Sequence, residues 1–434
     1  MSVVLQSWLG DLAAVVLVVL AAAYVWFSHS FTYWTRRGVP QRQPQFPFGN
    51  VRQSVLGQTR FEFVVQDIYN ELKGEKYFGM YGFSRPLLVL TDPDLIRLVL
   101  VKDFDSFNNR GVPFNDREPL NHNLFFLTGV KWRRLRNKLT PTFTTGKLKM
   151  MCQTMQDCGR EMLEVLEESA GRGEVLEMRE VSARYATDVI ASVAFGVECN
   201  CQRNPEAEFR QWGRKVFQPS LKNRFSMFMH DFLPTLAKLL RIGGGTEEVS
   251  QYFRSMVRET VEHREKNSVT RNDFMHLLIQ LKNRGFVDEE KTHAATDQNK
   301  EVDNWKLSLD DVAAQAFLFF LAGFETSSTT MSFALYELAL NPDVQKRLQE
   351  EVDATMKKNN GQLTYEAISE MSYLDKVVAG MRLGLLQAKI GLAYLTSKYE
   401  VQCCEHTTVP IEFNKVSFIP MPAGGVQLRL AKRA

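Results

Sequence analysis

The sequence has few cysteines and almost no net charge, and each shortage excludes a class of protein. Six cysteines in 434 residues are too few for the disulfide framework of a secreted domain. Their close pairings, Cys199 with Cys201 and Cys403 with Cys404, lack the C-x-x-C spacing and nearby histidines of a zinc site. A net charge of +3 is too small to indicate a nucleic-acid partner. We therefore expect a reduced, cytosol-facing protein that binds no nucleic acid.

Two other common signals are also missing. Gly243-Gly244-Gly245 interrupts a helical stretch, but no Gly-Lys-Ser or Gly-Lys-Thr follows it. This run therefore predicts a loop and not a phosphate-binding cradle. The sequence shows no internal repeats, and 434 residues suit one large domain or two smaller ones.

Charged side chains are absent from a long N-terminal stretch. No Asp, Glu, Lys or Arg occurs from Leu12 to Thr35, and Leu12 to Phe27 is an unbroken run of sixteen apolar residues. About 20 such residues span a bilayer core at ~1.5 Å per residue. We predict a transmembrane helix within an anchor over residues 1–35. Aromatic residues and a basic flank support it and place the rest of the chain on the cytoplasmic side: Tyr24, Trp26, Tyr33, Trp34, Arg36, Arg37 and Arg42.

A cleaved signal peptide is the alternative, because Ala21-Ala22-Ala23 could serve as a cleavage site. Residues 1–11 carry no basic side chain, which the start of a signal peptide needs, and this favours the anchor. Residues 36–50 are basic and contain several prolines, and they predict a stiff, non-helical hinge. The main domain would then be residues 51–434.

The main domain is predicted to be mostly α-helical with a small β-sheet. Strand-like runs at Tyr77–Tyr81 and Leu87–Thr91 flank a turn sequence and indicate a hairpin. Residues 92–94 then have the Asp-Pro-Asp pattern of a helix start. Helical periodicity dominates residues 131–282, and strand-like runs return in the last forty residues.

A long apolar helix is predicted between Ser308 and Asn341. Ser308 and Asp311 have the spacing of a capping box, and Asn341-Pro342 marks the helix end. The roughly 32 residues between these signals would measure ~48 Å at 1.5 Å each. Apolar side chains occur nearly all round the helix, which predicts that it is buried.

The middle of this helix holds polar groups that a buried helix rarely contains. Glu325 and the hydroxyl run Thr326–Thr330 follow the small residues Ala322 and Gly323. A buried carboxylate is costly unless it is paired or used, and small residues let a flat group lie against the helix. Two interpretations stay open. Either the helix is a bent core helix whose Glu325 reaches solvent, or Glu325 and Thr326 deliver protons to a bound group.

A basic, aromatic segment over residues 131–138 predicts a second functional helix. Trp132 and Arg136 are four residues apart and so lie on one helix face. An indole N–H and a guanidinium together can hold a carboxylate. The alternatives are a solvated face and a phosphate-binding helix. The other basic side chains of the segment are expected to face outward and to attract an acidic partner: Arg133, Arg134 and Lys138.

Together these features resemble a microsomal cytochrome P-450 of the insect detoxification type. The likeness covers nearly all of the chain: the anchor and hinge, the hairpin, Trp132 and Arg136, Leu139–Phe143, Ala322–Ser327, and Leu335–Pro342. It implies the cytochrome P-450 fold, haem b, and oxidation of lipophilic compounds such as xenobiotics, insecticides and hormones with O2. Electrons would come from NADPH-cytochrome P-450 reductase at the endoplasmic reticulum membrane.

The resemblance also assigns site residues. It implies that Trp132 and Arg136 contact the haem propionates. Ala322 and Gly323 would lie against the haem face, and Glu325 and Thr326 would deliver protons.

One part of the family pattern is missing. In the family, Met371–Val378 continues into a glutamate-x-x-arginine helix, then into sheet strands and a loop with the haem-ligating cysteine. Here Gly380–Gln387 instead matches what directly follows that cysteine, so Val378 stands at the position of the ligand. The resemblance therefore implies an incomplete cytochrome P-450 domain over residues 51–434, with a family deletion of about 70 residues between 378 and 379.

None of the six cysteines is expected to replace the ligand, because an axial thiolate needs a fixed proximal loop and supporting hydrogen bonds. We expect impaired haem binding and an inactive chain that is a shortened isoform or a faulty gene model. The alternative is a non-catalytic protein of the endoplasmic reticulum that competes for P-450 reductase through its basic face. A basic-helix binder of nucleic acid or anionic lipid is a third hypothesis, disfavoured by the low net charge.

Overall fold

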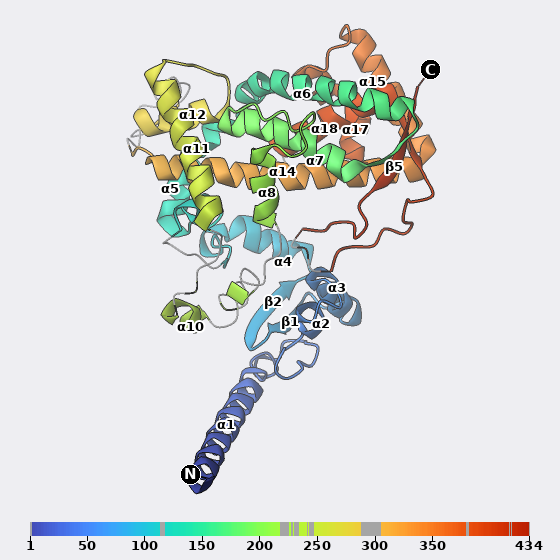
Figure 1. Ribbon diagram of the computed structural model, residues 1–434. Helices are drawn as coiled ribbons and strands as arrows, with labels where there is room; N and C mark the ends of the chain where they lie inside the picture. The colour runs from blue at the N-terminus through green and yellow to red at the C-terminus, as the bar shows by residue number, and fades with distance from the viewer. Residues whose placement is uncertain are drawn as a thin grey trace. The chain divides into compact units, whose positions relative to one another are not determined.

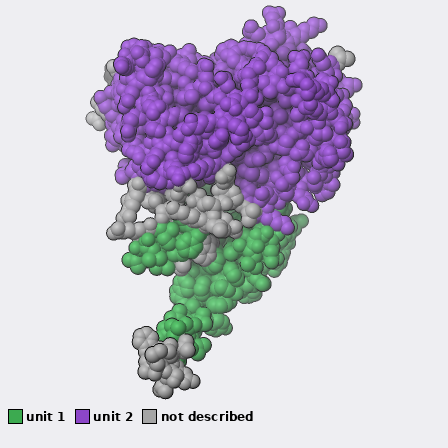
Figure 2. All heavy atoms as spheres, viewed as in Figure 1, with its two compact units in different colours: residues 1–113, 220–243 green, residues 114–219, 244–434 purple. Residues whose placement is uncertain are grey.

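The computed structural model describes residues 2–112, 118–217, 225–226, 229, 234–240, 242, 247–287, 305–378, 382–415, 417 and 419–433. Most of these residues are helical, as the sequence predicts (Figure 1). The chain divides into two compact units (Figure 2), residues 1–113 with 220–243 and residues 114–219 with 244–434. The expected boundaries of anchor, hinge and main domain at residues 35 and 50 stay a prediction. The glycine run at 243–245 lies outside the described residues.

The first unit contains the apolar N-terminal helix. Helix α1 covers Ser2–Ser30, and among the described residues Gly10–Arg37 is the one helical stretch long and apolar enough to cross a membrane. Its end is fixed to the hairpin, because Trp34 Nε1 donates to the Met80 carbonyl O at 3.1 Å. The other elements of this unit are α2 (Arg52–Val55), α3 (Phe61–Glu71), β1 (Tyr77–Gly82), β2 (Arg85–Leu90), α4 (Pro93–Arg97) and α10 (Pro234–Leu239).

The hairpin of β1 and β2 is tighter than the sequence suggests. The strands pair antiparallel from Tyr77 opposite Leu90 to Gly82 opposite Arg85, so only Phe83 and Ser84 form the turn. Phe83 has a φ of 54°, which a two-residue hairpin turn requires. The predicted helix start after β2 is confirmed, because the Asp92 side chain accepts hydrogen bonds from the first turn of α4.

The second unit is a helical body built around the predicted long helix. Helix α14 (Leu309–Leu340) begins with the expected Ser308–Asp311 capping box and ends at Asn341. In Figure 1 it runs through the middle of the body, against α7. The surrounding helices are α5 (Gly129–Leu139), α6 (Thr145–Gly171), α7 (Met178–Ile190), α8 (Glu208–Phe217), α11 (Glu247–Lys266), α12 (Phe274–Asn283), α15 (Pro342–Lys358), α16 (Tyr365–Glu370), α17 (Ser372–Val377) and α18 (Arg382–Lys398).

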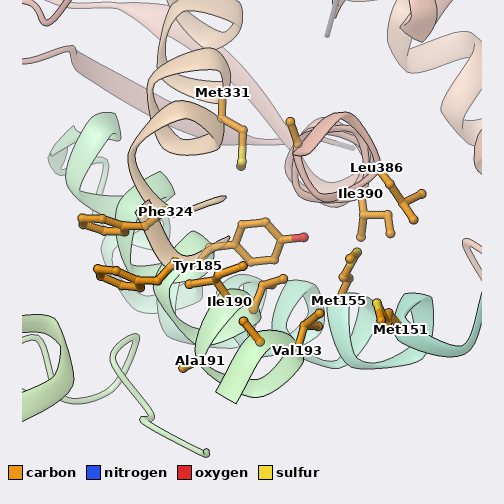
Figure 3. Close-up of a cluster of buried hydrophobic side chains, with 14 of the residues drawn as sticks. Met151, Met155, Tyr185, Ile190, Ala191, Val193, Phe324, Met331, Leu386 and Ile390 are labelled. Carbon is orange, nitrogen blue, oxygen red and sulfur yellow. The ribbon is translucent and has the colours of Figure 1, made fainter. Parts of the chain in front are cut away.

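The core of this body lies where α6, α7, α14 and α18 meet (Figure 3). Tyr185 of α7 donates its hydroxyl hydrogen to the Gln387 carbonyl O of α18 at 3.1 Å. A Cβ atom at Gly391 would lie 2.5 Å from Met331 Cε and 2.8 Å from Tyr185 Cε1. Glycine is therefore what lets α18 approach α14 and α7 closely at this point.

A small sheet closes one end of the second unit, as the strand-like pattern near the C-terminus predicts. It contains β3 (Val175–Glu177), β4 (Tyr399–Cys403) and β5 (Gln427–Lys432). The strand order is β3-β5-β4, and both pairings are antiparallel. The sheet brings the chain end back against the residues that precede α7.

A charge cluster joins α8 to α7. Glu180 of α7 accepts from Arg184 Nε at 2.9 Å, from Arg210 Nη2 at 2.7 Å and from Arg214 Nη2 at 3.1 Å. Arg210 is buried, so its charge depends on this carboxylate. Removing the charge of Glu180 would leave three neighbouring cations without their shared counter-ion.

We expect Glu180 to contribute to the loss of stability in acid. Burial alone would raise its pKa, but Arg210, Arg184 and Arg214 outweigh burial and hold the pKa below the ordinary value of 4.5. A carboxyl group with a lowered folded-state pKa stabilises the fold above its unfolded pKa and stops doing so as the pH falls through the folded value. The free energy of unfolding, measured in urea from about pH 7 to about pH 3, should therefore fall less steeply for Glu180→Gln than for the parent. Parallel curves would contradict this.

Candidate functional site

The centre of α14 presents its predicted site residues on two different sides. Ala322 and Thr326, one turn apart, are exposed, whereas Glu325 is buried and Gly323 is half-buried. The Thr326 hydroxyl donates to the Ala322 carbonyl O of its own helix. The two exposed residues form a small, open face, and the other two face neighbouring helices.

Gly323 lies against α7. A Cβ atom at Gly323 would be 2.6 Å from Ile190 Cδ1, so the side chain of Ile190 occupies the space that a larger residue would need. Figure 3 shows Ile190 and Phe324 in the same cluster of buried side chains, and Phe324 directly follows Gly323. The small residue therefore serves helix packing in this chain.

Glu325 is held in an ion pair that the sequence does not reveal. Its side chain is only 3% exposed, and Arg179 Nη2 of α7 donates to Glu325 Oε1 at 2.5 Å. The same Arg179 nitrogen lies 3.2 Å from Met421 Sδ. The interpretation in which Glu325 reaches solvent at the bundle edge is wrong, because the carboxylate is buried and paired. Proton delivery by Glu325 and Thr326 stays a prediction.

The basic segment forms the predicted helix, α5, which begins at Gly129 and ends at Leu139. Trp132 is half-buried and packs on the core of the second unit, whereas Arg136 is exposed. In the part of the chain that the structure describes, Arg136 forms no ion pair with a carboxylate. The structure therefore confirms that the two residues share a helix, and their role stays a prediction.

The outward orientation expected for Lys138 is wrong. Lys138 is buried, and its Nζ donates to the Gly285 carbonyl O at 2.5 Å. The reason is helical spacing, because Lys138 shares a face with Leu135 and Leu139, which are also buried. Arg133 and Arg134 are exposed as expected, and the Arg134 guanidinium lies 4.8 Å from the centre of the Trp305 ring.

Val378 lies where the sequence places the break in the family pattern. It follows the last residue of α17, its N–H donates to the Leu374 carbonyl O at 3.0 Å, and it is only 2% exposed. Residues 379–381 lie outside the described residues, and α18 begins at Arg382. A groove of about 630 Å³ lies beside Val378, and the other residues that line it are Thr330, Phe333, Ala334, Glu337, Leu338, Asn341, Val344, Tyr373, Lys376 and Val377.

The thiols near the C-terminus do not suit iron. Cys403 is the last residue of β4, and burial raises the pKa of its thiol. Cys404 Sγ donates to the Gln427 carbonyl O at 3.6 Å and accepts from Thr407 Oγ1 at 3.5 Å. Cys403 thus belongs to the small sheet and Cys404 directly follows β4, whereas the resemblance implies a haem ligand that is a thiolate on a fixed proximal loop.

Three of the other four thiols are also unsuited. Burial raises the pKa of Cys152 and Cys158, and a hydrogen bond with Cys199 together with burial raises that of Cys201. A raised pKa keeps a thiol protonated, whereas metals bind the thiolate. The described part of the chain also holds no group of three or more His, Cys, Asp or Glu residues suited to a metal ion.

Comparison with known proteins identifies the family. A model of the cytochrome P450 family matches residues 40–379. The chain belongs to the cytochrome P450 family. Family membership implies a haem cofactor. The thiols that are buried or have a raised pKa do not fit haem iron, and these are Cys152, Cys158, Cys201 and Cys403.

Similar proteins include family-6 cytochromes P450 of insects, and this chain is of that type. Cytochrome P450 6k1 of Blattella germanica is 40% identical over 85% of this P450 and 71% of its own length. Cytochrome P450 6A1 of Musca domestica is 40% identical over 85% and 70%. Cytochrome P450 6a2 of Drosophila melanogaster is 33% identical over 96% of this P450 and 98% of its own length. The last alignment has 509 positions, although the chain has 434 residues.

Two site neighbours could not be found by reading the sequence of this P450. Arg179 lies 146 residues before its partner Glu325, and Ile190 meets Gly323 across α7 and α14. A buried carboxylate does signal that some cation is nearby. It does not say which of the 53 Lys and Arg residues provides the charge.

Proposed function

We propose that this chain is a shortened cytochrome P450 whose own haem-dependent activity is lost. The observation that carries the proposal is that the match to the family ends at Ala379, directly after the buried Val378. The alignment to the Drosophila melanogaster relative supports it, because at least 75 of its positions (509 less 434) face no residue of this chain. The missing segment would contain the Glu-x-x-Arg helix and the cysteine loop.

The unshortened product of the same gene would be the enzyme. It would be a monooxygenase that oxidises lipophilic compounds with O2 and electrons from NADPH-cytochrome P-450 reductase. In that product Trp132 and Arg136 would contact the haem propionates, and Ala322 and Gly323 would lie along the haem face. Glu325 and Thr326 would deliver protons, provided that Arg179 releases the carboxylate it holds in this chain.

The proposed location is the endoplasmic reticulum membrane, with an anchor over residues 1–35, a hinge over residues 36–50 and a domain over residues 51–434 that faces the cytoplasm. The apolar length of α1 supports the anchor. The arginines that follow it support a cytoplasmic position for the remaining chain.

A comparison of the two products tests the proposal. Both are expressed with reductase in the same cells, and both should appear in the microsomal fraction, because they share α1. Only the unshortened product should oxidise a lipophilic test substrate when NADPH is added. Turnover by the shortened chain, above that of membranes without it, would contradict the proposal.

A non-catalytic role is the second candidate, in which the chain competes for reductase. It is favoured by the exposed basic side chains Lys131, Arg133 and Arg136 on α5, which would attract an acidic surface. Capture of reductase by the chain should weaken several-fold in a Lys131→Glu/Arg133→Glu variant and at high salt. Arg134 should be left in place, because it lies over the Trp305 ring. Unchanged capture by the variant would reject this role.

A further inference from the structure

The two outer edges of the β1–β2 hairpin differ. The edge of β1 is covered, because the Gly79 N–H donates to the Pro40 carbonyl O at 2.8 Å and the Tyr81 N–H donates to Asn50 Oδ1 at 2.8 Å. Among the described residues the sheet has only these two strands. The edge of β2 is therefore the open side of the sheet.

The hydrogen-bonding groups on the open edge follow from the register. Gly79 and Tyr81 point their backbone groups away from β2, so the residues opposite them, Leu88 and Pro86, point theirs away from β1. The same alternation turns the backbone of Leu90 outward. The outward N–H donors of β2 are those of Leu88 and Leu90, since Pro86 has none.

The open edge is also apolar. No charged residue occurs from Pro86 to Leu90, and Leu88 is 50% exposed. A groove of about 580 Å³ borders the end of the strand and is lined by Glu62, Phe63, Val65, Gln66 and Tyr69 of α3 with Val89, Leu90 and Thr91. Proteins normally protect such an edge with charge, proline, a covering segment or a bulge. Strand β2 has Arg85 and Pro86 at its start, and the continuous register from Leu87 to Leu90 contains no charge, proline or bulge.

We propose that the outer edge of β2 pairs antiparallel with the same edge of a second copy of this chain, centred on Leu88. In this register the two Leu88 residues exchange both backbone hydrogen bonds. Each Leu90 N–H donates to the Pro86 carbonyl O of the other copy. Each outward donor of Pro86–Leu90 thus finds an acceptor, but the Leu90 carbonyl O receives no hydrogen bond from the other copy, because Pro86 has no N–H.

A second copy fits this edge because the edge is complementary to itself under a two-fold rotation. The side chains that meet in the pairing are all apolar, Leu88 with Leu88 and Leu90 with Pro86. The result would be a continuous four-stranded sheet across the dimer. A strand from a different protein is the alternative occupant of this edge, and cross-linking distinguishes it from a second copy.

The oligomeric state of the full chain in detergent micelles tests the proposal. By light scattering the parent should have about twice the protein mass of one chain, which is 49.8 kDa. Leu88→Lys should be a monomer with unchanged circular dichroism, because its side chain is exposed and its backbone N–H and carbonyl point away from β1. Val130→Lys, which changes an 84% exposed residue of the other unit, should remain a dimer. A monomeric parent, or a Leu88→Lys protein that still dimerises, would overturn the proposal.

Cross-linking tests the register. The Cα atoms of the two residues at position 88 should be about 5.5 Å apart, and those of the two residues at position 90 about 14 Å apart, since they are offset by four residues of strand. A short thiol cross-linker should join Leu88→Cys into dimers well above the background of the parent, which has six cysteines. Leu90→Cys should stay at background. Equal cross-linking of both variants, or cross-linking only to another protein, would overturn the pairing.

Discussion

Purified after expression with excess haem, the chain is expected to hold far less than one haem per molecule and to give no thiolate-type spectrum. The physical reason is that, under the proposed deletion, Val378 stands at the ligand position and offers no ligand atom. Cys152 and Cys201 are buried, burial raises the pKa of Cys158, and Cys403 and Cys404 lie at the end of β4. Extracted haem measured against protein concentration checks the first part, and a carbon monoxide difference spectrum checks the second. The unshortened product, purified in parallel, is the positive control. Stoichiometric haem in the shortened chain would contradict the account.

A single substitution should not repair this defect. Val378→Cys supplies a sulfur in a side chain of similar size, so the fold should be kept. The new thiol would lie in the core at the end of α17, where Val378 is only 2% exposed, and burial would keep it protonated. We therefore expect the haem content of Val378→Cys to equal that of the parent. Full loading of this variant would show that the ligand position is intact and that no segment is missing.

Removing Arg179 is expected to destabilise the second unit strongly. Arg179→Ala leaves the Glu325 carboxylate buried without its cation, and breaking a buried pair in this way costs about 3–5 kcal/mol. The Arg179 side chain is 31% exposed, so water reaches the pair from one side and the lower end, ~3 kcal/mol, is expected. Denaturant unfolding in micelles, followed by circular dichroism, measures this loss.

Two controls separate the loss of a buried pair from a general effect of losing arginine. Arg160→Ala removes the exposed ion pair with Asp157, and exposed pairs contribute about 0–1 kcal/mol. Arg179→Ala combined with Glu325→Gln should recover much of the loss, because no buried charge then remains. A cost for Arg179→Ala as small as that of Arg160→Ala would show that the Glu325 pair does not stabilise α7 against α14.

The elements that could be predicted from the sequence are those fixed by local signals. Helix α14 begins at the predicted capping box and ends at the predicted Asn341, because cap chemistry involves neighbouring residues only. The N-terminal helix follows from its apolar composition, and the hairpin follows from two strand-like runs on either side of a turn sequence. The turn of the hairpin was predicted too long, because Gly82 and Arg85 still pair across it.

The parts that could not be predicted depend on contacts between distant residues. Glu325 finds Arg179 only because α7 packs along α14, and no local pattern states that packing. The carbonyl O that accepts from the buried Lys138 ammonium belongs to Gly285, which is remote in sequence. The family motifs identify the residues of the site, but the partners of those residues come from tertiary packing.

Sequencing genomic DNA and transcripts across the codons for Val377 to Leu383 tests the central claim most directly. The account predicts that about 70 codons, encoding a Glu-x-x-Arg helix and a cysteine loop, lie in the gene between Val378 and Ala379 and are retained in the major transcript. The chain described here would then be a by-product of an active P450 gene. Adjacent codons for Val378 and Ala379 within one genomic exon would contradict the account, because the gene itself would then encode a P450 without a haem ligand.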